Sequence, residues 1–354
     1  MPLIIDAHLD MAYNAVVLHR DLLRPLSELR AHDTLTPPPG LPCGSALVSL
    51  PELWRGQVAV AGASIFISPA FRDWEREAQV YHTPAEAHAQ GVAQLDYYRR
   101  LADEQERVRL LLTEADLDAV WASWETPHPQ LGLFIVMEGA DPIREPGELT
   151  WWIERGLRGV GLAWSAGTRY AGGCAAPGGL SDEGRRLLAR MADAHLLLDV
   201  SHLWEEAVYE ALDSYPGPLV ATHANPRALV DTPRQLSDDL IRRIAERAGV
   251  MGVVPFNAML QAGWRVGDPR LPLSRLIEVI DHICQTTGQA DCVGIGSDFD
   301  GGFGLEAVPE GLTSIADLGK IAALLYERGY SEADVAAILH GNWLRIFRHV
   351  LRAM

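Results

Sequence analysis

The chain has 354 residues, of which 48% are hydrophobic and 22% are charged, and its formal net charge at pH 7 is −17. This composition is typical of a globular protein. The acidic balance argues against nucleic acid and anionic membranes as partners, because both are themselves negatively charged.

The sequence also indicates where the protein resides in the cell and what its cysteines can do. No apolar run is long enough to span a bilayer and the N-terminus lacks a secretory pattern, so we expect a cytoplasmic protein. The four cysteines are scattered without a C-x-x-C pair, which argues against a disulfide framework and against a thiolate zinc site.

Eight short apolar runs predict β-strands, and amphipathic stretches that predict helices fall between many of them. The near-continuous apolar character of the runs is typical of a parallel sheet covered on both faces. The alternation predicts an α/β fold, and eight strands favour a closed (β/α)8 TIM-type barrel over the alternative, an open doubly wound sheet. The predicted strands cover residues 3–7, 61–67, 131–137, 160–163, 196–200, 219–222, 250–255 and 292–296.

Polar residues mark the starts of several predicted helices, because a side-chain oxygen at the N-cap accepts a hydrogen bond from the first turn. These are Thr113 in the capping box Thr113-Glu-Ala-Asp116, Ser181 before a helix over 182–194, Ser237 before a helix over 238–247, and Ser331 before a terminal helix.

The stretch 22–54 interrupts the alternation. It contains Thr36-Pro-Pro-Pro-Gly40 and other turn-forming residues. We interpret it as an insertion over the mouth of the barrel, so the whole chain, 1–354, is expected to form one domain.

The first and third predicted strands end in residues that suit a metal site. In Asp6-Ala-His8-Leu-Asp10, His8 and Asp10 point the same way if the strand continues, and imidazole with carboxylate is a normal zinc pair. Glu138 follows the apolar run of the third strand, where a carboxylate is costly unless it is paired, ligated or exposed. Its two oxygens suit it to bridge two ions. If either motif stood alone, a solvated strand end would explain it as well as a metal site does, or better.

Histidines follow the fifth and sixth strands, at His202 and His223. Because catalytic groups gather at the C-terminal ends of barrel strands, we expect them to join the same cluster. A single histidine there is more often a hydrogen-bonded structural residue, but two on consecutive strands together with His8 favour a metal site. Asp199 is either a partner of the ligands or a helix-capping group, and we do not expect it to be a ligand.

The eighth strand leads into Asp298-Phe-Asp300 within a glycine-rich turn. One carboxylate can serve as a general base while the other holds the loop by hydrogen bonds. The alternative is an aspartate-rich turn without chemistry, which is common.

Taken together, the motifs resemble the membrane (renal) dipeptidase family of the amidohydrolase superfamily, from about residue 4 to Phe347. The most specific of them is the glycine-rich one after the eighth strand. The motifs are Asp6-Ala-His-Leu-Asp10, Met137-Glu-Gly139, Asp199-Val-Ser-His202, Thr222-His-Ala-Asn225, Gly296-Ser-Asp-Phe-Asp-Gly301 and the closing Gly341-Asn-Trp-Leu-Arg-Ile-Phe347.

The resemblance implies a zinc-dependent dipeptidase with a binuclear site at the C-terminal end of the barrel strands, in which a water shared by the two ions attacks the amide of a small dipeptide, L,D-dipeptides included. It also implies a homodimer. Carried over, His8 and Asp10 bind one Zn²⁺, His202 and His223 bind the other, Glu138 bridges both, Asp298 is the acid/base, and Arg234 holds the substrate carboxylate.

Two departures from the family pattern concern the substrate. Trp164 occupies the place of a family histidine that contacts the scissile carbonyl region, and Asn257 stands where a tyrosine is expected. We expect Trp164 to line the pocket and to favour a substrate with an apolar group. The alternative is that its ring turns outward over the barrel rim. Arg169 and Tyr170 are candidates to replace the lost donor.

Other functions and metals stay open at this point. One is hydrolysis of another small amide, such as an N-acyl amino acid or a lactam, by the same fold. A non-enzymatic binding barrel is less favoured, because none of the five ligands is missing. The ligand types also suit other divalent metals such as manganese and cobalt.

Overall fold

The structure is a computed structural model that describes residues 2–35, 44–70 and 79–353. Eight parallel strands follow one another in the order β11, β10, β7, β6, β2, β1, β13, β12. A parallel bridge between Ala221 and Met251 joins the two ends of this order, so the sheet closes into the predicted barrel. The ring strands are β1 (Ile4–Leu9), β2 (Val58–Phe66), β6 (Leu131–Glu138), β7 (Leu157–Gly161), β10 (Leu197–Asp199), β11 (Leu219–Val220), β12 (Met251–Val253) and β13 (Val293–Ile295).

All eight predicted strands are confirmed, with ends that differ from the prediction by at most three residues. The reason is burial: every residue of β2 and of β6 is buried, and apart from Ser64 and Glu138 both strands consist of apolar residues and glycine. Five further strands in the described part of the chain lie outside the ring and were not predicted. They are β5 (Val108–Leu110), which pairs with the start of β6 outside the ring, and the pairs β3 (Ser68–Pro69) with β4 (Val80–Tyr81) and β8 (Ala171–Gly173) with β9 (Ala176–Leu180).

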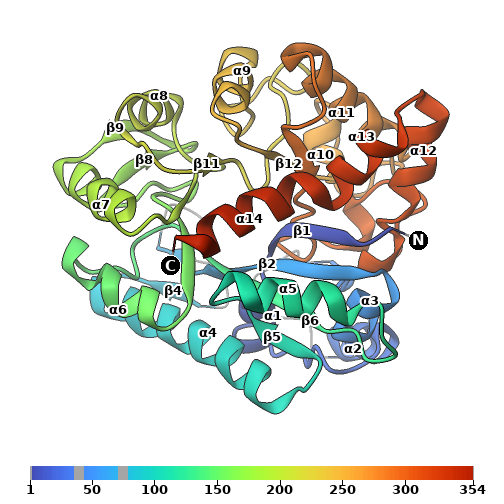
Figure 1. Cartoon of the computed structure of the whole chain (residues 1–354), viewed down its shortest axis with the longest axis horizontal. Helices are drawn as coiled ribbons and strands as arrows, with labels where there is room; N and C mark the ends of the chain where they lie inside the picture. Colours follow the sequence, from blue (N-terminus) through green and yellow to red (C-terminus); the bar gives the residue numbers. More distant parts are fainter. Residues whose placement is uncertain (1, 36–43, 71–78, 354) are drawn as a thin grey trace.

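Helices surround the ring (Figure 1). Within the described residues, no helix combines the length and apolar character needed to cross a membrane. The α-helices are α1 (Met11–Val16), α2 (Leu26–Leu35), α3 (Leu50–Arg55), α4 (Pro84–Glu104), α5 (Glu114–Ser123), α6 (Leu149–Glu154), α7 (Asp182–Asp193), α8 (Glu205–Ser214), α9 (Asp238–Glu246), α10 (Asn257–Leu260), α11 (Ser274–Thr287), α12 (Lys320–Arg328), α13 (Glu332–Ala336) and α14 (Asn342–Arg352). Short 3-10 helices cover Pro146–Glu148, Leu305–Ala307 and Ile315–Asp317, and a π-helical turn covers Ala337–Gly341.

Three of the four predicted caps form as expected. Thr113 and Ser331 each make a complete capping box with the aspartate three residues later, and the hydroxyl of Ser181 accepts a hydrogen bond in the first turn of α7. Ser237 occupies the N-cap of α9 but makes no capping bond. Its hydroxyl donates instead to the carboxylate of Glu205, at 2.8 Å.

Helix α14 closes the N-terminal end of the barrel, and Figure 1 shows it crossing the middle of the molecule. Its Phe347 ring stacks on Phe134 of β6 with centroids 4.0 Å apart, and Trp343 Nε1 donates to the carbonyl of Ile295 at 2.9 Å. A Cβ at Gly294 would lie 2.1 Å from Trp343 Nε1, so only glycine fits there. The closing motif of the sequence therefore serves packing.

The stretch interpreted as an insertion carries α2 and α3 and connects β1 to β2 by way of α1. Its Thr36–Gly40 segment lies outside the described residues. The part after it is tied to the loop that follows β13, because the backbone N–H groups of Leu47 and Val48 both donate to the carboxylate of Asp300 at 2.9 Å. The segment thus reaches the C-terminal end of the ring.

Candidate metal centre

The five expected metal ligands lie at the C-terminal ends of ring strands. Glu138 is the last residue of β6, His8 is the penultimate residue of β1, and Asp10 follows β1 directly. His202 and His223 come three residues after the ends of β10 and β11. All five are buried, with at most 8% of the residue exposed. Closing the sheet into a ring is what brings these distant residues together.

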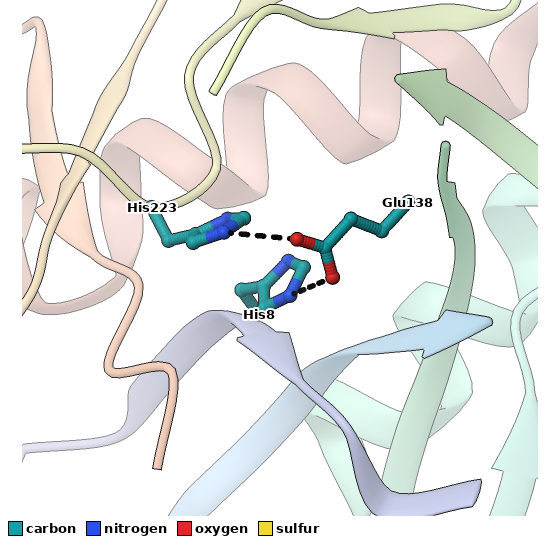
Figure 2. Close-up of side chains that lie close together, drawn as sticks. All are labelled: His8, Glu138 and His223. Atoms are coloured by element: carbon teal, nitrogen blue, oxygen red, sulfur yellow. Dashed lines mark hydrogen bonds and ion pairs between the residues drawn. The ribbon is translucent and has the colours of Figure 1, made fainter. Parts of the chain in front are cut away.

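The carboxylate of Glu138 lies between histidines from different strands, two of which are drawn in Figure 2. Its Oε2 is 3.2 Å from His8 Nε2, whereas its Oε1 is 2.9 Å from Nε2 of His202 and 3.4 Å from Nε2 of His223. The last two Nε2 atoms are themselves 2.9 Å apart. One oxygen therefore faces His8 and the other faces the His202–His223 pair.

Asp10 reaches this cluster in a way that strand alternation does not predict. β1 ends at Leu9, and Asp10 is the N-cap of α1. Its Oδ1 lies 3.8 Å from His8 Nε2, and the hydroxyl of Ser64 donates to the same carboxylate oxygen. The expected pairing of His8 with Asp10 is present, but the start of α1 creates it.

Negative charge is concentrated around His8. Burial raises the pKa of Asp10 to about 6, and the neighbouring Glu138 adds to this rise. Burial also raises the pKa of Asp298 well above its usual range. Burial alone would lower the pKa of His8, but the carboxylates of Glu138, Asp10 and Asp298 raise it to about 10. Buried carboxylates this close together call for positive charge among them.

The chemistry of the donors fits divalent cations. Imidazole nitrogens and carboxylate oxygens are zinc ligands, and they suit manganese and cobalt as well. All three histidines present Nε2 to the cluster, because each Nδ1 meets a hydroxyl. Thr222 Oγ1 lies 3.2 Å from Nδ1 of His8 and 2.9 Å from Nδ1 of His223, and Ser165 Oγ lies 2.8 Å from Nδ1 of His202.

The two aspartates after β13 occupy different surroundings. The ligand atoms of His8, Asp10 and Asp298 lie within 4.8 Å of one another, so Asp298 faces the cluster. Asp300 accepts the backbone hydrogen bonds of residues 47 and 48 described above, so it holds the loop. Both have positive φ, 56° and 66°, a conformation that is uncommon outside glycine and tolerated best by aspartate and asparagine.

A cavity of about 300 Å³ opens onto the cluster. Two apolar walls flank it, and Arg234 is the one cationic side chain among the described residues that line it. One wall comes from Tyr13, Leu18, Phe66 and Trp164, the other from Phe256, Met259 and Phe303, and the polar floor from Asp10, Glu138, His202, Asp298 and Asp300.

Comparison with known proteins identifies the family of this chain. The model of the family described as membrane dipeptidase (Peptidase family M19) matches residues 2–353. The chain belongs to the membrane dipeptidase family. It is 32% identical over 259 residues to an uncharacterized protein in the pqqA 5′ region of Klebsiella pneumoniae, an alignment that covers 71% of this chain and 92% of that relative. The resemblance stated from the motifs is confirmed, and the protein is a hydrolase of a metal-dependent peptidase family.

Solved structures of similar fold include peptidases. The probable dipeptidase PvdM of Pseudomonas aeruginosa superposes with a TM-score of 0.81 at 21% identity, covering 100% of this chain and 96% of that one. A metallopeptidase of Rhodobacter sphaeroides, solved with a phosphinate mimic of the dipeptide L-Ala-D-Ala, superposes with a TM-score of 0.80 at 24% identity and covers 99% of both chains.

Trp164 lies on the cavity wall, as expected. Its ring centroid is 4.9 Å from that of Phe66 and 6.0 Å from that of His202. The ring therefore does not turn outward over the barrel rim. The expectation that Arg169 or Tyr170 replaces the lost donor is wrong. Both line other parts of the fold: Tyr170 donates to the carbonyl of Ile143, and Arg169 contacts Asp141 and a backbone carbonyl.

The two other residues expected to contact substrate differ in position. Arg234 lines the cavity and is held in place by bonds from its guanidinium to the carbonyls of Ser201, at 2.7 Å, and of His223, at 2.8 Å. Asn257 is fully buried at the start of α10, and its amide donates to the carbonyl of Val308 at 3.3 Å. It does not line the cavity, so its position gives no support to a contact with substrate.

Sequence reasoning missed the hydroxyls of Thr222 and Ser165, which meet the histidine Nδ1 atoms, and Ser64, which meets Asp10. Two of the three had a local signal, since Thr222 directly precedes His223 and Ser165 directly follows Trp164. Ser64 had none, because its contact with Asp10 depends on the pairing of β1 with β2.

Proposed function

We propose that this family member is a dipeptidase that uses two divalent ions, with zinc as the metal that the ligand set suits best. In this proposal His8 and Asp10 hold one ion, His202 and His223 hold the other, and Glu138 bridges them. The observation that carries it is the position of Glu138, whose Oε2 lies 3.2 Å from His8 and whose Oε1 lies 2.9 and 3.4 Å from the other two histidines.

When bound, such a pair of ions activates a water molecule and polarises the scissile carbonyl. Asp298, at the edge of the cluster, takes the proton that is released when the amide is attacked and passes it to the leaving amine. Asp300 is committed to the backbone of residues 47 and 48, so it keeps Asp298 in position and takes no part in proton transfer.

The cavity supports a small substrate with one carboxylate. Among the described residues, the bonds of Arg234 to backbone carbonyls use two of its five N–H groups, so a guanidinium edge remains for a bidentate contact with a substrate carboxylate. The two apolar walls then receive the two side chains of a dipeptide. A relative of this fold binds a mimic of L-Ala-D-Ala, so we include L,D-dipeptides among the substrates.

A second candidate reaction is hydrolysis of an N-acyl amino acid. The position of Trp164 favours it, because an indole beside Phe66 and His202 offers a large apolar face and at most one neutral donor. An acyl chain needs no recognition of an amino group, and its carboxylate would still meet Arg234.

The decisive experiment is a hydrolysis screen with metal-loaded protein against L,L- and L,D-dipeptides and N-acyl amino acids. We expect turnover of dipeptides that is lost on chelation and restored by zinc. Arg234→Gln should raise KM for every substrate with a free carboxylate and have little effect on an amidated dipeptide. Hydrolysis of N-acyl amino acids alone would contradict the dipeptidase assignment and establish the alternative.

A further inference from the structure

The hydroxyl of Thr222 lies at the centre of a hydrogen-bond network behind the cluster. The side chain is fully buried. Its Oγ1 lies 2.5 Å from Asp199 Oδ2, 2.9 Å from His223 Nδ1 and 3.2 Å from His8 Nδ1. The rings of the two histidines stack with centroids 3.6 Å apart, which allows one oxygen to reach both Nδ1 atoms.

The number of hydrogens in this network determines which atoms donate its hydrogen bonds. The Oδ1 atom of Asp199 accepts hydrogen bonds from the backbone N–H groups of Ser201 and Thr222, each at 3.0 Å. Its Oδ2 atom accepts a hydrogen bond from the Thr222 hydroxyl. A hydroxyl has one proton and two lone pairs. Because the Thr222 hydroxyl donates its hydrogen to Asp199, Oγ1 can only accept hydrogen bonds from the two histidines. Each Nδ1 must therefore carry a hydrogen.

A fourth contact does not change this count. Ser201 Oγ lies 3.3 Å from Thr222 Oγ1, but the Ser201 hydroxyl donates its hydrogen bond to Asp199 Oδ1, at 2.5 Å. His202 belongs to a separate arrangement, because its Nδ1 meets Ser165 Oγ at 2.8 Å. The three histidines therefore depend on two different hydroxyls.

We propose that Thr222 is a positioning residue that holds both His8 and His223 with Nδ1 protonated and Nε2 directed to the metals, so that one hydroxyl supports both ion sites. The inference rests on the proposed two-metal centre, in which His8 binds one ion and His223 the other. Asp199 orients the hydroxyl, and Ser165 Oγ contacts the Nδ1 of His202 alone. Groups of this kind typically change metal affinity about 10–100-fold.

Zinc-binding titrations against a competing chelator test the proposal. Thr222→Val keeps the shape of the side chain and removes the hydroxyl, so we expect both ions to bind about 10–100-fold more weakly. Thr222→Ser keeps the hydroxyl and should bind both ions nearly as tightly as the wild-type protein. Ser165→Ala is the matched control, and it should weaken only the ion held by His202 and His223.

Histidine-selective ¹⁵N NMR of the zinc-loaded protein gives a readout that does not depend on activity. In Thr222→Val, the hydrogen-bonded Nδ1–H signals of His8 and His223 should shift or be lost to exchange, while that of His202 stays. If Thr222→Val does not fold, Asp199→Asn gives the same test. The amide NH2 of the new asparagine would donate a hydrogen bond to Thr222 Oγ1. The Thr222 hydroxyl would then have to donate to Nδ1 of His8 or of His223, and that nitrogen could no longer carry a hydrogen.

The outcomes separate this inference from the proposed function. A wild-type protein that binds no metal contradicts the two-metal centre itself. A wild-type protein that binds two ions, with Thr222→Val equal to it in affinity and in Nδ1–H signals, contradicts the role of Thr222 alone. Thr222→Ser behaving like Thr222→Val also contradicts it, because the methyl group and not the hydroxyl would then matter.

Discussion

Strand β6 meets different surroundings at its middle and at its C-terminal end. Phe134 stacks on Phe347 of α14 at an interplanar angle of 9°, whereas Glu138 lies among three histidines. The two residues are four positions apart, so they lie on the same face of the strand, about 13 Å from each other. One face of one strand thus provides packing at the N-terminal end of the barrel and chemistry at the C-terminal end.

Unusual backbone conformations occur at both ends of the barrel. At the C-terminal end, Asp298 and Asp300 hold positive φ angles, and Gly139 after Glu138 has φ of 81°. At the N-terminal end, α14 is a regular helix whose buried face is almost wholly apolar. Gln57, His195 and Ala248, just before β2, β10 and β12, also have positive φ. What separates the two ends is therefore the polarity of the buried side chains and not the backbone. Substitutions at the two ends should therefore fail in different ways.

The largest effect is expected at Glu138. Glu138→Ala removes the group that lies between the two histidine sets, so the protein should lose both ions and all measurable hydrolysis while staying folded. Elemental analysis with circular dichroism checks this, and Glu138→Gln, which keeps the shape, is the control for packing. Full metal content and activity in Glu138→Ala would contradict the proposed bridge.

Asp298 should affect rate without affecting metal. Asp298→Asn removes the proton acceptor, and we expect kcat to fall about 10²–10⁴-fold with nearly unchanged metal content. Asp300→Asn is the comparison variant, since Asp300 accepts the bonds of residues 47 and 48. Its main effect should be on thermal stability. If Asp300→Asn lost more kcat than Asp298→Asn, the two roles would have to be exchanged.

At the opposite end, Phe347→Ala should act on stability alone. Removing a buried ring that stacks on Phe134 should lower the free energy of unfolding by about 3–5 kcal/mol. Below its melting temperature, the variant should keep the metal content and kcat of the wild-type protein. Tyr326→Ala, at a side chain that is 49% exposed, is a control expected to have almost no effect. Loss of metal in folded Phe347→Ala would show that the two ends are coupled.

The smallest effect is expected at the cavity wall. Trp164→His restores a donor and removes the apolar face beside Phe66, so kcat/KM should rise for simple dipeptides and fall for substrates with a bulky apolar group. A change of about tenfold in the ratio of the two corresponds to 1.4 kcal/mol of discrimination and is easily measured. An unchanged ratio would remove Trp164 from substrate recognition.

Much of the fold and of the cluster could be predicted because two signals are local. A strand buried on both faces is an apolar run. A polar residue directly after such a run is conspicuous, as at Glu138, and so is a histidine within three residues of its end, as at His202 and His223. The unpredicted features depend on distant partners. Ser237 donates to Glu205 from another helix, and β5 forms a strand only because the edge of β6 is open beside it.

Asn257 and Thr222 show the same limit within the site. Asn257 was expected at the substrate, but α10 buries it against the carbonyl of Val308, a partner 51 residues away in sequence. Thr222 reaches Asp199 because β10 and β11 pair in a register that places Asp199 opposite Val220. Sequence order identifies residue types near a motif, but the register of neighbouring strands decides which of them touch.

The central claim is that the C-terminal end of the barrel holds two metal ions on either side of Glu138. A crystal structure of the zinc-loaded protein, with data collected at the zinc absorption edge, tests it directly. We expect two anomalous peaks about 3.5–4 Å apart, one beside His8 and Asp10 and one beside His202 and His223, with the Glu138 carboxylate between them. A lone peak, or peaks away from Glu138, would contradict the account.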